Sequence, residues 1–177
     1  MAYHEIFEKI EAGDLFILDG GTGTELEKRG VPMEPGAWCG VAALNNANIL
    51  EEIHTDYLEA GADIITANTY STSRLMLALS GYEKNFLEIN TKTIEAAQRA
   101  RENSSKKNIL IAGSVSHRGP ISEGTAIPDK QDQNSTHQFE YALTELAHVL
   151  REEGCDFIIL EMMYDPEKIK AAFSAAE

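Results

Sequence analysis

The sequence predicts an α/β protein built on a parallel β-sheet. The main observation is a repeat in which four apolar runs end in polar or small residues at Asp19, Ala67, Ser114 and Glu161, with spacings of 48, 47 and 47 residues. The runs are apolar throughout, which is typical of strands buried on both faces of a parallel sheet. Helix-patterned segments separate them. Right-handed units of this kind build either a doubly wound sheet or a (β/α)₈ barrel.

The four runs show where the strands are expected. They read LFILDGG, DIITANT, NILIAGS and DFIILEM around the four positions just given. All but NILIAGS also have a glycine and an aspartate at or just before the start of the run. The repeat therefore extends beyond hydrophobicity, and it indicates four βα units.

Helical periodicity fills the intervals between the strands. The N-terminal residues 1–14 are charged and helix-patterned, and apolar residues recur on one face in 48–61, 85–103 and 135–154, with a final helix starting in 165–177. We expect Asn45 or Asn46 to cap the first of these intervening helices and Gly61 to end it. Ser135 and Gly154 are the corresponding start and stop of the helix in 135–154.

One long linker interrupts the pattern after the third strand. Residues 115–134 are rich in glycine, proline and polar side chains. This position puts the linker at the C-terminal end of the strands, where a functional or mobile loop is expected.

Composition limits the classes of function. The chain has 177 residues, 43% of them hydrophobic and 25% charged, so we expect a single domain over residues 1–177. The net charge of −14 repels nucleic acid backbones and anionic membrane surfaces, which argues against such partners. The N-terminus lacks the apolar core of a signal peptide, and no apolar run reaches membrane-spanning length. Two cysteines without paired spacing fit a reducing cytoplasm.

The stretch LFILDGGTGTE, residues 15–25, contains glycines that could suggest a phosphate-binding loop. It has no lysine directly after a glycine, as a Walker loop requires, and Gly21 and Gly23 are followed by Glu25 and Leu26 without the third glycine of a dinucleotide fingerprint. We therefore interpret Asp19 as an acid at a strand end, followed by glycines that permit close approach of a ligand or of another backbone segment. The alternative is that Asp19 only caps the turn.

Glu161 follows the apolar run FIIL in the same way. A carboxylate at the end of a buried strand is costly unless it is paired, hydrogen-bonded or bound to a cationic ligand. A structural ion pair with a lysine or arginine is one interpretation. Because Asp19 and Glu161 occupy equivalent positions of the repeat, a small ligand with a positive end, such as an ammonium group, is the other.

Four segments together resemble a known family. ILDGGTGTELEKRGV, GAWCGVAALNNANILEEIHTDYLEAGADIITANTYSTS, ILIAGSVS and CDFIILEMM occur in the order and at the spacing of the N-terminal half of the homocysteine S-methyltransferase domain. This family includes betaine and S-methylmethionine methyltransferases and the homocysteine module of cobalamin-dependent methionine synthase. The resemblance implies a (β/α)₈ barrel, of which this chain carries about four βα units, a half-barrel.

The resemblance also implies a chemistry and a set of residues. In the family, zinc held by three cysteine thiolates binds the homocysteine sulfur, lowers its pKa and prepares it to take a methyl group, giving methionine in one-carbon metabolism. The substrate-binding positions match Asp19, Gly20, Gly21, Trp38, Asn68, Thr69, Tyr70, Ser114 and Glu161. Of these, Glu161 matches the acid that binds the substrate ammonium. Trp38 is otherwise interpreted as an anchor of a surface loop.

Several positions depart from the family pattern. Ala67 stands where a threonine is usual, Cys39 where serine or threonine is common, and Ser116 and His117 replace a usual Gly-Pro. His117 is interpreted either as a general acid or base or as a solvated loop residue. The family's zinc cysteines belong to the sixth and eighth strands, so the zinc ligands are absent from this chain, and Cys155 is expected on the face opposite the site.

These observations predict the substrate-binding half of a homocysteine S-methyltransferase, without catalytic or metal-binding residues and inactive by itself, because a complete barrel needs about 250 residues. One alternative is a non-catalytic half-barrel that binds an amino acid or assembles with a partner. Another is an unrelated α/β enzyme that uses Asp19 and Glu161 as acid and base. Four units leave two unpaired sheet edges, so we expect a homo-oligomer or a chain that requires a C-terminal half.

Overall fold

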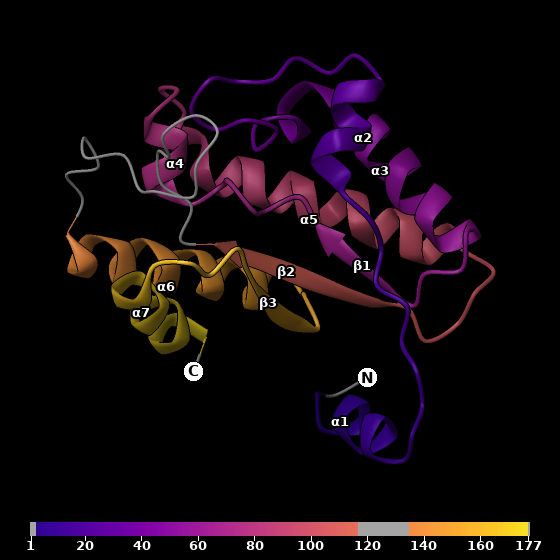
Figure 1. Ribbon diagram of the computed structural model, residues 1–177. Coiled ribbons are helices and arrows are strands. Elements are labelled where there is room, and N and C mark those ends of the chain that lie inside the picture. The colour runs from indigo at the N-terminus through magenta and orange to yellow at the C-terminus, as the bar shows by residue number, and fades with distance from the viewer. Residues whose placement is uncertain (1–2, 117–134, 177) are drawn as a thin grey trace.

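The protein is an α/β structure with a three-stranded parallel sheet. The computed structural model describes residues 3–116 and 135–176, and the strands are β1 (Ile64–Ala67), β2 (Leu110–Ser116) and β3 (Phe157–Glu161) in the order β1-β2-β3. Ile64 pairs with Leu110, and Ser116 pairs with Glu161. Helices lie in the connections between the strands, and the C-terminal ends of all three strands point the same way (Figure 1).

The helices confirm most of the predicted pattern. The N-terminal predicted segment forms α1 (Tyr3–Glu11), and the four later segments form α3 (Ala43–Glu59), α5 (Phe86–Asn103), α6 (Thr136–Glu152) and α7 (Pro166–Ala176). The sequence did not indicate α2 (Thr22–Lys28), α4 (Arg74–Ala78) or the 3₁₀ helix η1 (Glu83–Asn85). These three elements are too short to show a hydrophobic period.

The first predicted strand is wrong as a full strand. Residues 15–18 form only a single parallel bridge, between Leu18 and Ile64. Three backbone hydrogen bonds secure it: the amides of Asp63 and Ile64 donate to the carbonyl of Ile17 at 2.8 and 3.1 Å, and the amide of Asp19 donates to the carbonyl of Ile64 at 3.0 Å. The segment lies at the sheet edge and, among residues 3–116 and 135–176, has a neighbour on one side only, so pairing there is limited to the part closest to β1.

Burial differs between the strands. β2 is buried along its whole length, as predicted, whereas β3 is half-buried throughout and Ile17 is 58% exposed. The prediction that every run is buried on both faces is therefore wrong for the two edges. Within the described residues β2 lies between two strands, whereas β1 has a strand on one side and only the Leu18 bridge on the other.

The helix caps are confirmed for α6, whereas for α3 the stop at Gly61, with φ +110°, is confirmed and the N-cap is corrected. The hydroxyl of Ser135 accepts a hydrogen bond from the amide of Gln138, whose side chain in turn accepts one from the amide of Ser135, forming a capping box. Gly154 follows α6 with φ +92°, as expected of a helix stop. By contrast, α3 begins at Ala43, and Asn46 is a kink with φ −133° rather than a cap.

The main core lies between the sheet and its helices. It contains Ile65, Ile111 and Val115 from the strands, together with Ile89 from α5 and Leu146 from α6. The opposite face of the sheet carries a smaller cluster, in which Ile6 of α1 packs with residues near the strand starts, including Ile64 and Leu110. Figure 1 shows α1 set apart from the other helices, beyond the strand starts.

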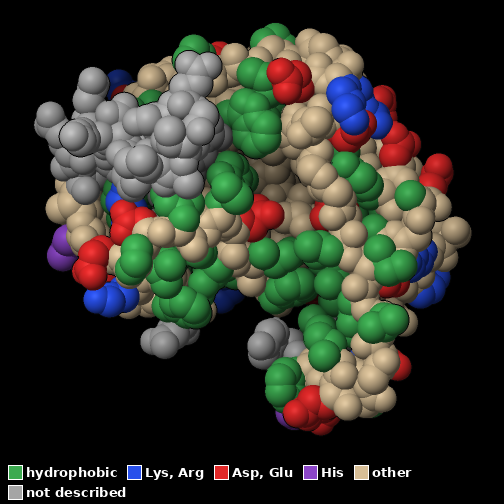
Figure 2. Space-filling view, viewed as in Figure 1, with side chains coloured by type: hydrophobic (Ala, Val, Ile, Leu, Met, Phe, Trp, Pro, Cys, Tyr) green, Lys and Arg blue, Asp and Glu red, His purple; other side chains and the backbone are tan. Residues whose placement is uncertain are grey.

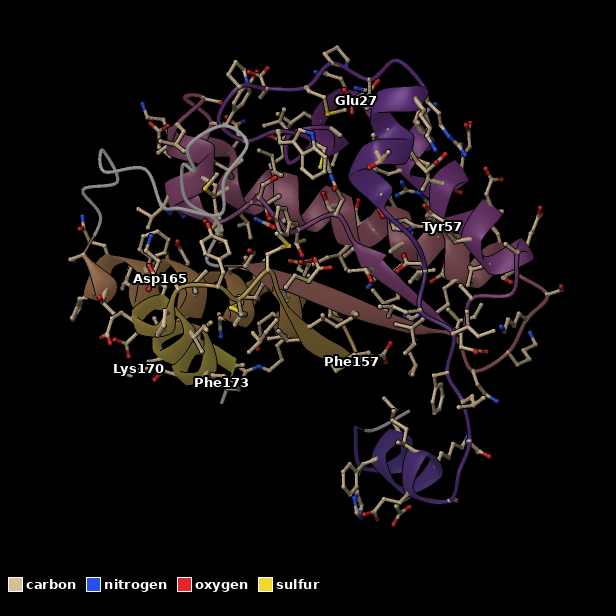
Figure 3. All side chains as sticks on the ribbon, in the orientation of Figure 1. Glu27, Tyr57, Phe157, Asp165, Lys170 and Phe173 are labelled. Carbon is tan, nitrogen blue, oxygen red and sulfur yellow. The ribbon has the colours of Figure 1, made fainter. Side chains whose placement is uncertain are left out.

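On that second face Ile64, Leu110 and Ala112 are buried, and within the described residues the exposed apolar side chains lie at the edge of the sheet, at Leu15 and Ile17. Figure 2 shows apolar atoms running from the middle of the molecule toward α1, and Figure 3 shows Phe157 on β3 and Phe173 on α7. Phe173 is 59% exposed. Among residues 3–116 and 135–176, no helix is both long enough and apolar enough to cross a bilayer.

Most of the predicted linker at 115–134 lies outside the described residues. Val115 and Ser116 belong to β2. Residues 117–134, including His117, lie outside the described residues, so the two interpretations of His117 stay predictions.

Candidate functional site

A cavity of about 450 Å³ opens at the C-terminal ends of the strands. Figure 2 shows a hollow near the middle of the surface, with acidic atoms among apolar ones. Many of the predicted site residues line the cavity, together with residues that the sequence did not suggest. The lining consists of Leu18, Asp19, Gly20, Gly21, Thr22, Gly23, Trp38, Cys39, Thr66, Ala67, Asn68, Tyr70, Glu161 and Met162.

Asp19 is held in the cavity wall by β1. Its two carboxylate oxygens accept hydrogen bonds from the amide of Thr66 at 2.7 Å and from the hydroxyl of Thr66 at 2.8 Å. Burial raises the pKa of Asp19 above its ordinary value, and the negative charge of Glu161 raises it further, while the Thr66 hydrogen bonds act in the opposite direction. A positive group placed between the two acids would stabilise the charged form.

Glu161, at the end of β3, is held by β2. The hydroxyl of Ser114 donates a short hydrogen bond to a carboxylate oxygen of Glu161. In the sheet register Glu161 pairs with Ser116, the last residue of β2, so the repeat positions Ser114 and Glu161 are offset by two residues although both strands end at the same level. The repeat correctly indicated that Asp19 and Glu161 share one end of the sheet, but not this offset.

The interpretation of Glu161 as half of a structural ion pair finds no support in the described part of the chain. Within residues 3–116 and 135–176, no lysine or arginine forms an ion pair with Asp19 or with Glu161. Two acids therefore face one cavity there without a cationic side chain between them.

Thr69 and Ser114 connect the strands and do not line the cavity. The hydroxyl of Thr69 donates to the carbonyl of Ser114 at 2.8 Å and accepts from the amide of Ser114 at 2.9 Å. These bonds fix the end of β1 to β2 and place the Ser114 hydroxyl beside Glu161. Thr69 therefore positions Ser114, and Ser114 in turn holds the carboxylate of Glu161.

Trp38 and Tyr70 form an aromatic wall of the cavity. Their ring centroids lie 6.2 Å apart with an interplanar angle of 83°, an edge-to-face arrangement. Trp38 has a left-handed backbone, with φ +48°, and exchanges two backbone hydrogen bonds with Glu34, at 2.8 and 2.9 Å. The loop that carries Trp38 is therefore held by backbone hydrogen bonds, and its tryptophan lines the cavity.

Asn68 is locked to Cys39, a residue that the sequence marked only as a departure. The Asn68 amide nitrogen donates to the backbone carbonyl of Cys39 at 2.8 Å, and the Cys39 thiol donates to the Asn68 side-chain oxygen at 3.2 Å. This reciprocal pair joins the tryptophan loop to the segment after β1.

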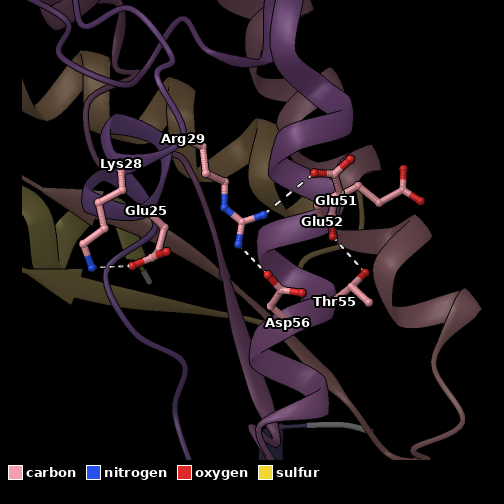
Figure 4. A network of polar contacts seen from close by, with 7 residues as sticks. All are labelled: Glu25, Lys28, Arg29, Glu51, Glu52, Thr55 and Asp56. Carbon is pink, nitrogen blue, oxygen red and sulfur yellow. Dashed lines mark hydrogen bonds and ion pairs between the residues drawn. The ribbon is translucent and has the colours of Figure 1, made fainter.

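Gly20 allows the chain to pass close to Tyr57. A Cβ atom on Gly20 would lie 2.8 Å from the hydroxyl oxygen of Tyr57, so a side chain there must displace the tyrosine. Gly21 precedes α2 as its N-cap residue. Arg29, just after α2, forms ion pairs with Glu52 and Asp56 of α3, which hold α2 beside the cavity (Figure 4).

Thr66 is the clearest residue that sequence reasoning missed. The repeat aligned Asp19 with Ala67, whose side chain belongs to the main core on the helix side of the sheet. Side chains alternate between the two faces of a strand, so Thr66, one residue earlier, points to Asp19. That alternation, applied to the aligned run, was the signal available for finding it.

The described residues do not offer a zinc site. In residues 3–116 and 135–176, no group of three or more histidine, cysteine, aspartate or glutamate side chains is placed to hold a metal ion. Cys39 is engaged with Asn68, and Cys155 lines a different cavity, next to the start of β3. Burial raises the pKa of the Cys155 thiol to about 12, so it is not a thiolate near neutral pH.

Comparisons with known proteins show which family this chain resembles in sequence and in structure. A sequence model of the family described as "Homocysteine S-methyltransferase" matches residues 16–177. A Zea mays protein, "Homocysteine S-methyltransferase 2", is 30% identical over 174 residues, covering 90% of this chain and 50% of that protein. "Selenocysteine Se-methyltransferase" from Brassica oleracea var. italica is 30% identical over 182 residues, covering 91% of this chain and 51% of that protein.

A solved structure is similar as well. The metallated form of the homocysteine methyltransferase MmuM from Escherichia coli superposes with a TM-score of 0.73 at 27% identity, covering 89% of this chain and 57% of that chain. The chain thus spans about half the length of these relatives.

Proposed function

This chain belongs to the homocysteine S-methyltransferase family, and on that premise we propose that its cavity binds a homocysteine-type amino acid by the ammonium group. Asp19 and Glu161 would bind the ammonium. The observation that carries the proposal is that both acids line one cavity, with no lysine or arginine of the described residues paired to either. An ammonium ion compensates the cost of two like charges in a half-buried site.

The remaining predicted residues have places in this proposal. Trp38 and Tyr70 would cover the aliphatic part of the ligand, and Asn68, Gly20 and Gly21 would complete the wall around it. Relatives named for homocysteine and for selenocysteine share an amino acid with a thiol or selenol. We therefore assign a thiol-bearing amino acid as the substrate class.

The role proposed for this chain is substrate binding within a methyltransferase barrel. In the complete reaction a methyl group is transferred to the homocysteine sulfur, giving methionine. The described residues do not fit a zinc site, and we propose that the chain alone does not catalyse the transfer.

The other parts of the proposal concern the chain as a whole. Residues 1–177 would act as a single domain, a half-barrel that assembles with a second copy or with a C-terminal half. Cys39 and Cys155 are not in a disulfide, in keeping with a cytoplasmic location.

One observation supports a second candidate function. The raised pKa of Asp19 beside Glu161 is also typical of an acid and base pair that moves protons, as in an unrelated α/β enzyme. Such an enzyme has no reason to prefer homocysteine over amino acids of similar size, whereas the first proposal requires that preference.

The test is calorimetric titration of reduced L-homocysteine into the purified chain and into Glu161→Gln. This substitution removes the charge and keeps a hydrogen-bond acceptor for Ser114, so we expect the affinity to fall at least about tenfold, a loss of roughly 1.4 kcal/mol. Glu59→Gln, which neutralises an exposed acid on α3, is the matched control and should bind as the parent chain does. Equal affinity in Glu161→Gln and the parent chain would contradict the proposal.

A further inference from the structure

Gly23 lies where a side chain cannot be accommodated. It is buried in the first turn of α2, and a Cβ atom built there would be 2.4 Å from Cη2 of Trp38 and 2.8 Å from Cζ2 and Cζ3. These three atoms form the outer edge of the six-membered ring of the indole. The separations are far inside van der Waals contact, so any residue larger than glycine must displace the ring.

The backbone does not explain the glycine. Gly23 is absent from the glycines with a positive φ in the described chain, so an alanine could adopt the same helical conformation. Alanine also favours helices more than glycine does. Among the described residues, the close approach of the indole is the constraint that requires glycine at this position.

The indole has little freedom to give way. Its backbone is fixed by the two hydrogen bonds with Glu34, and the next residue, Cys39, is locked to Asn68. On the side of the cavity, Tyr70 meets the ring edge-to-face. Because Trp38 and Tyr70 both line the cavity, a displaced ring changes the shape of the ligand space.

From this geometry we propose that Gly23 is a specificity-determining positioning residue: its lack of a side chain sets where the Trp38 indole stands, and so sets the width of the cavity. The effect on ligand binding rests on the function proposed above. The effect on the position of Trp38 does not, because it depends only on the packing of α2 against the indole.

Trp38 reports its own position because it is the single tryptophan of the chain. In Gly23→Ala we expect a shifted emission maximum and altered quenching by acrylamide when the indole is excited selectively. Thr24→Ala, the adjacent exposed position on the same helix, is the matched control and should leave both properties unchanged. Unchanged fluorescence in Gly23→Ala overturns the proposal, whether or not homocysteine binds.

A double-mutant cycle separates the indole contact from other effects on α2. Trp38→Phe removes the outer ring atoms that a Cβ at position 23 would meet. We expect Gly23→Ala to weaken L-homocysteine binding about tenfold in the parent chain and less than about twofold in the Trp38→Phe background. An equal loss in both backgrounds would mean that Gly23 acts through the helix, and would overturn the proposal.

If the parent chain does not bind homocysteine, the function proposed above fails and the positioning proposal is still tested. The thermal midpoint then replaces the affinity as the readout of the cycle. Gly23→Ala should lower the midpoint in the parent chain and leave it unchanged, or raise it, in the Trp38→Phe background, where the helix preference of alanine is no longer opposed. A midpoint lowered equally in both backgrounds contradicts the proposal.

Discussion

Asp19 shows how single residues set the character of the site. Burial and the nearby charge of Glu161 disfavour the charged form of its carboxylate, and the two hydrogen bonds from Thr66 offset part of that cost. Ser114 gives Glu161 a similar partner. Each acid is therefore held in place by a neighbouring strand, while its charge remains available to a ligand.

Sequence reasoning reached these acids because each ends an apolar run at a regular spacing. It could not reach Thr66 or the lock between Cys39 and Asn68, because such contacts depend on the register of neighbouring strands and on a loop conformation. In the sequence, Gly23 stands out only as part of a glycine pattern that does not match a phosphate-binding motif. Its contact with Trp38 is visible only in three dimensions.

His54 supplies a prediction at the same scale. It is fully buried on α3, and in the described part of the chain neither ring nitrogen has a hydrogen-bond partner. Burial lowers the pKa of His54 from 6.5 to about 4. The folded state binds a proton on His54 less readily than the unfolded state does, so protonation of His54 favours unfolding. The contribution of neutral His54 to the free energy of unfolding is therefore fully present above pH 6.5. It is lost as the pH falls toward 4, and the total loss is about 3 kcal/mol.

Urea unfolding of the parent chain and of His54→Leu at pH 7 and at pH 4.5 checks this. The parent should lose more stability between the two pH values than the variant, because the variant has no imidazole to charge. His148→Leu, which removes an exposed histidine of α6, serves as the control and should keep the parental pH dependence. A parental pH dependence in His54→Leu would show that His54 does not carry the effect.

At the level of elements, the site is assembled from the ends of strands and from short helices. α2 is too short to be seen in the sequence, yet it places Gly20 to Gly23 along the cavity and is held to α3 by Arg29. The long helices α3, α5 and α6 were predictable because a full apolar face repeats along each. The first run failed as a strand because its outer edge has no described neighbour, and pairing is what makes an extended run a strand.

The capping box of α6 yields an element-scale prediction. Ser135→Ala removes the hydroxyl that accepts from the amide of Gln138, so we expect the free energy of unfolding to fall by about 1 kcal/mol. Urea unfolding measures the change. Thr144→Ala, an exposed substitution inside the same helix, should be neutral or slightly stabilising, since alanine favours helix interiors. A loss in Thr144→Ala as large as that in Ser135→Ala would refute the capping explanation.

The whole molecule leaves apolar surface at both edges of its sheet. Leu15 and Ile17 are 90% and 58% exposed at one edge, and Met162 is 61% exposed just after β3 at the other. Both edges run parallel and in the same direction, so β3 of one copy can pair with residues 15–18 of a second copy around a two-fold axis. We expect a homodimer built on this pairing.

Light scattering over a dilution series tests the assembly. The parent chain should have the mass of a dimer, and Ile17→Lys, which places a charge on the edge, should shift it toward a monomer. Leu87→Lys alters an equally exposed apolar residue, 59% against 58%, on α5 away from both edges, and should remain dimeric. A parent chain that stays monomeric at all concentrations and melts cooperatively would contradict this assembly.

The central claim is that two acids of one cavity bind the ammonium group of a thiol amino acid. Calorimetric titration of the parent chain with L-homocysteine and with N-acetyl-L-homocysteine tests it most directly, because acetylation converts the ammonium into a neutral amide carrying an acetyl group and leaves the thiol and carboxylate intact. The account predicts that acetylation weakens binding at least about tenfold, since Asp19 and Glu161 then face a neutral amide. Equal affinity for the two compounds would contradict it.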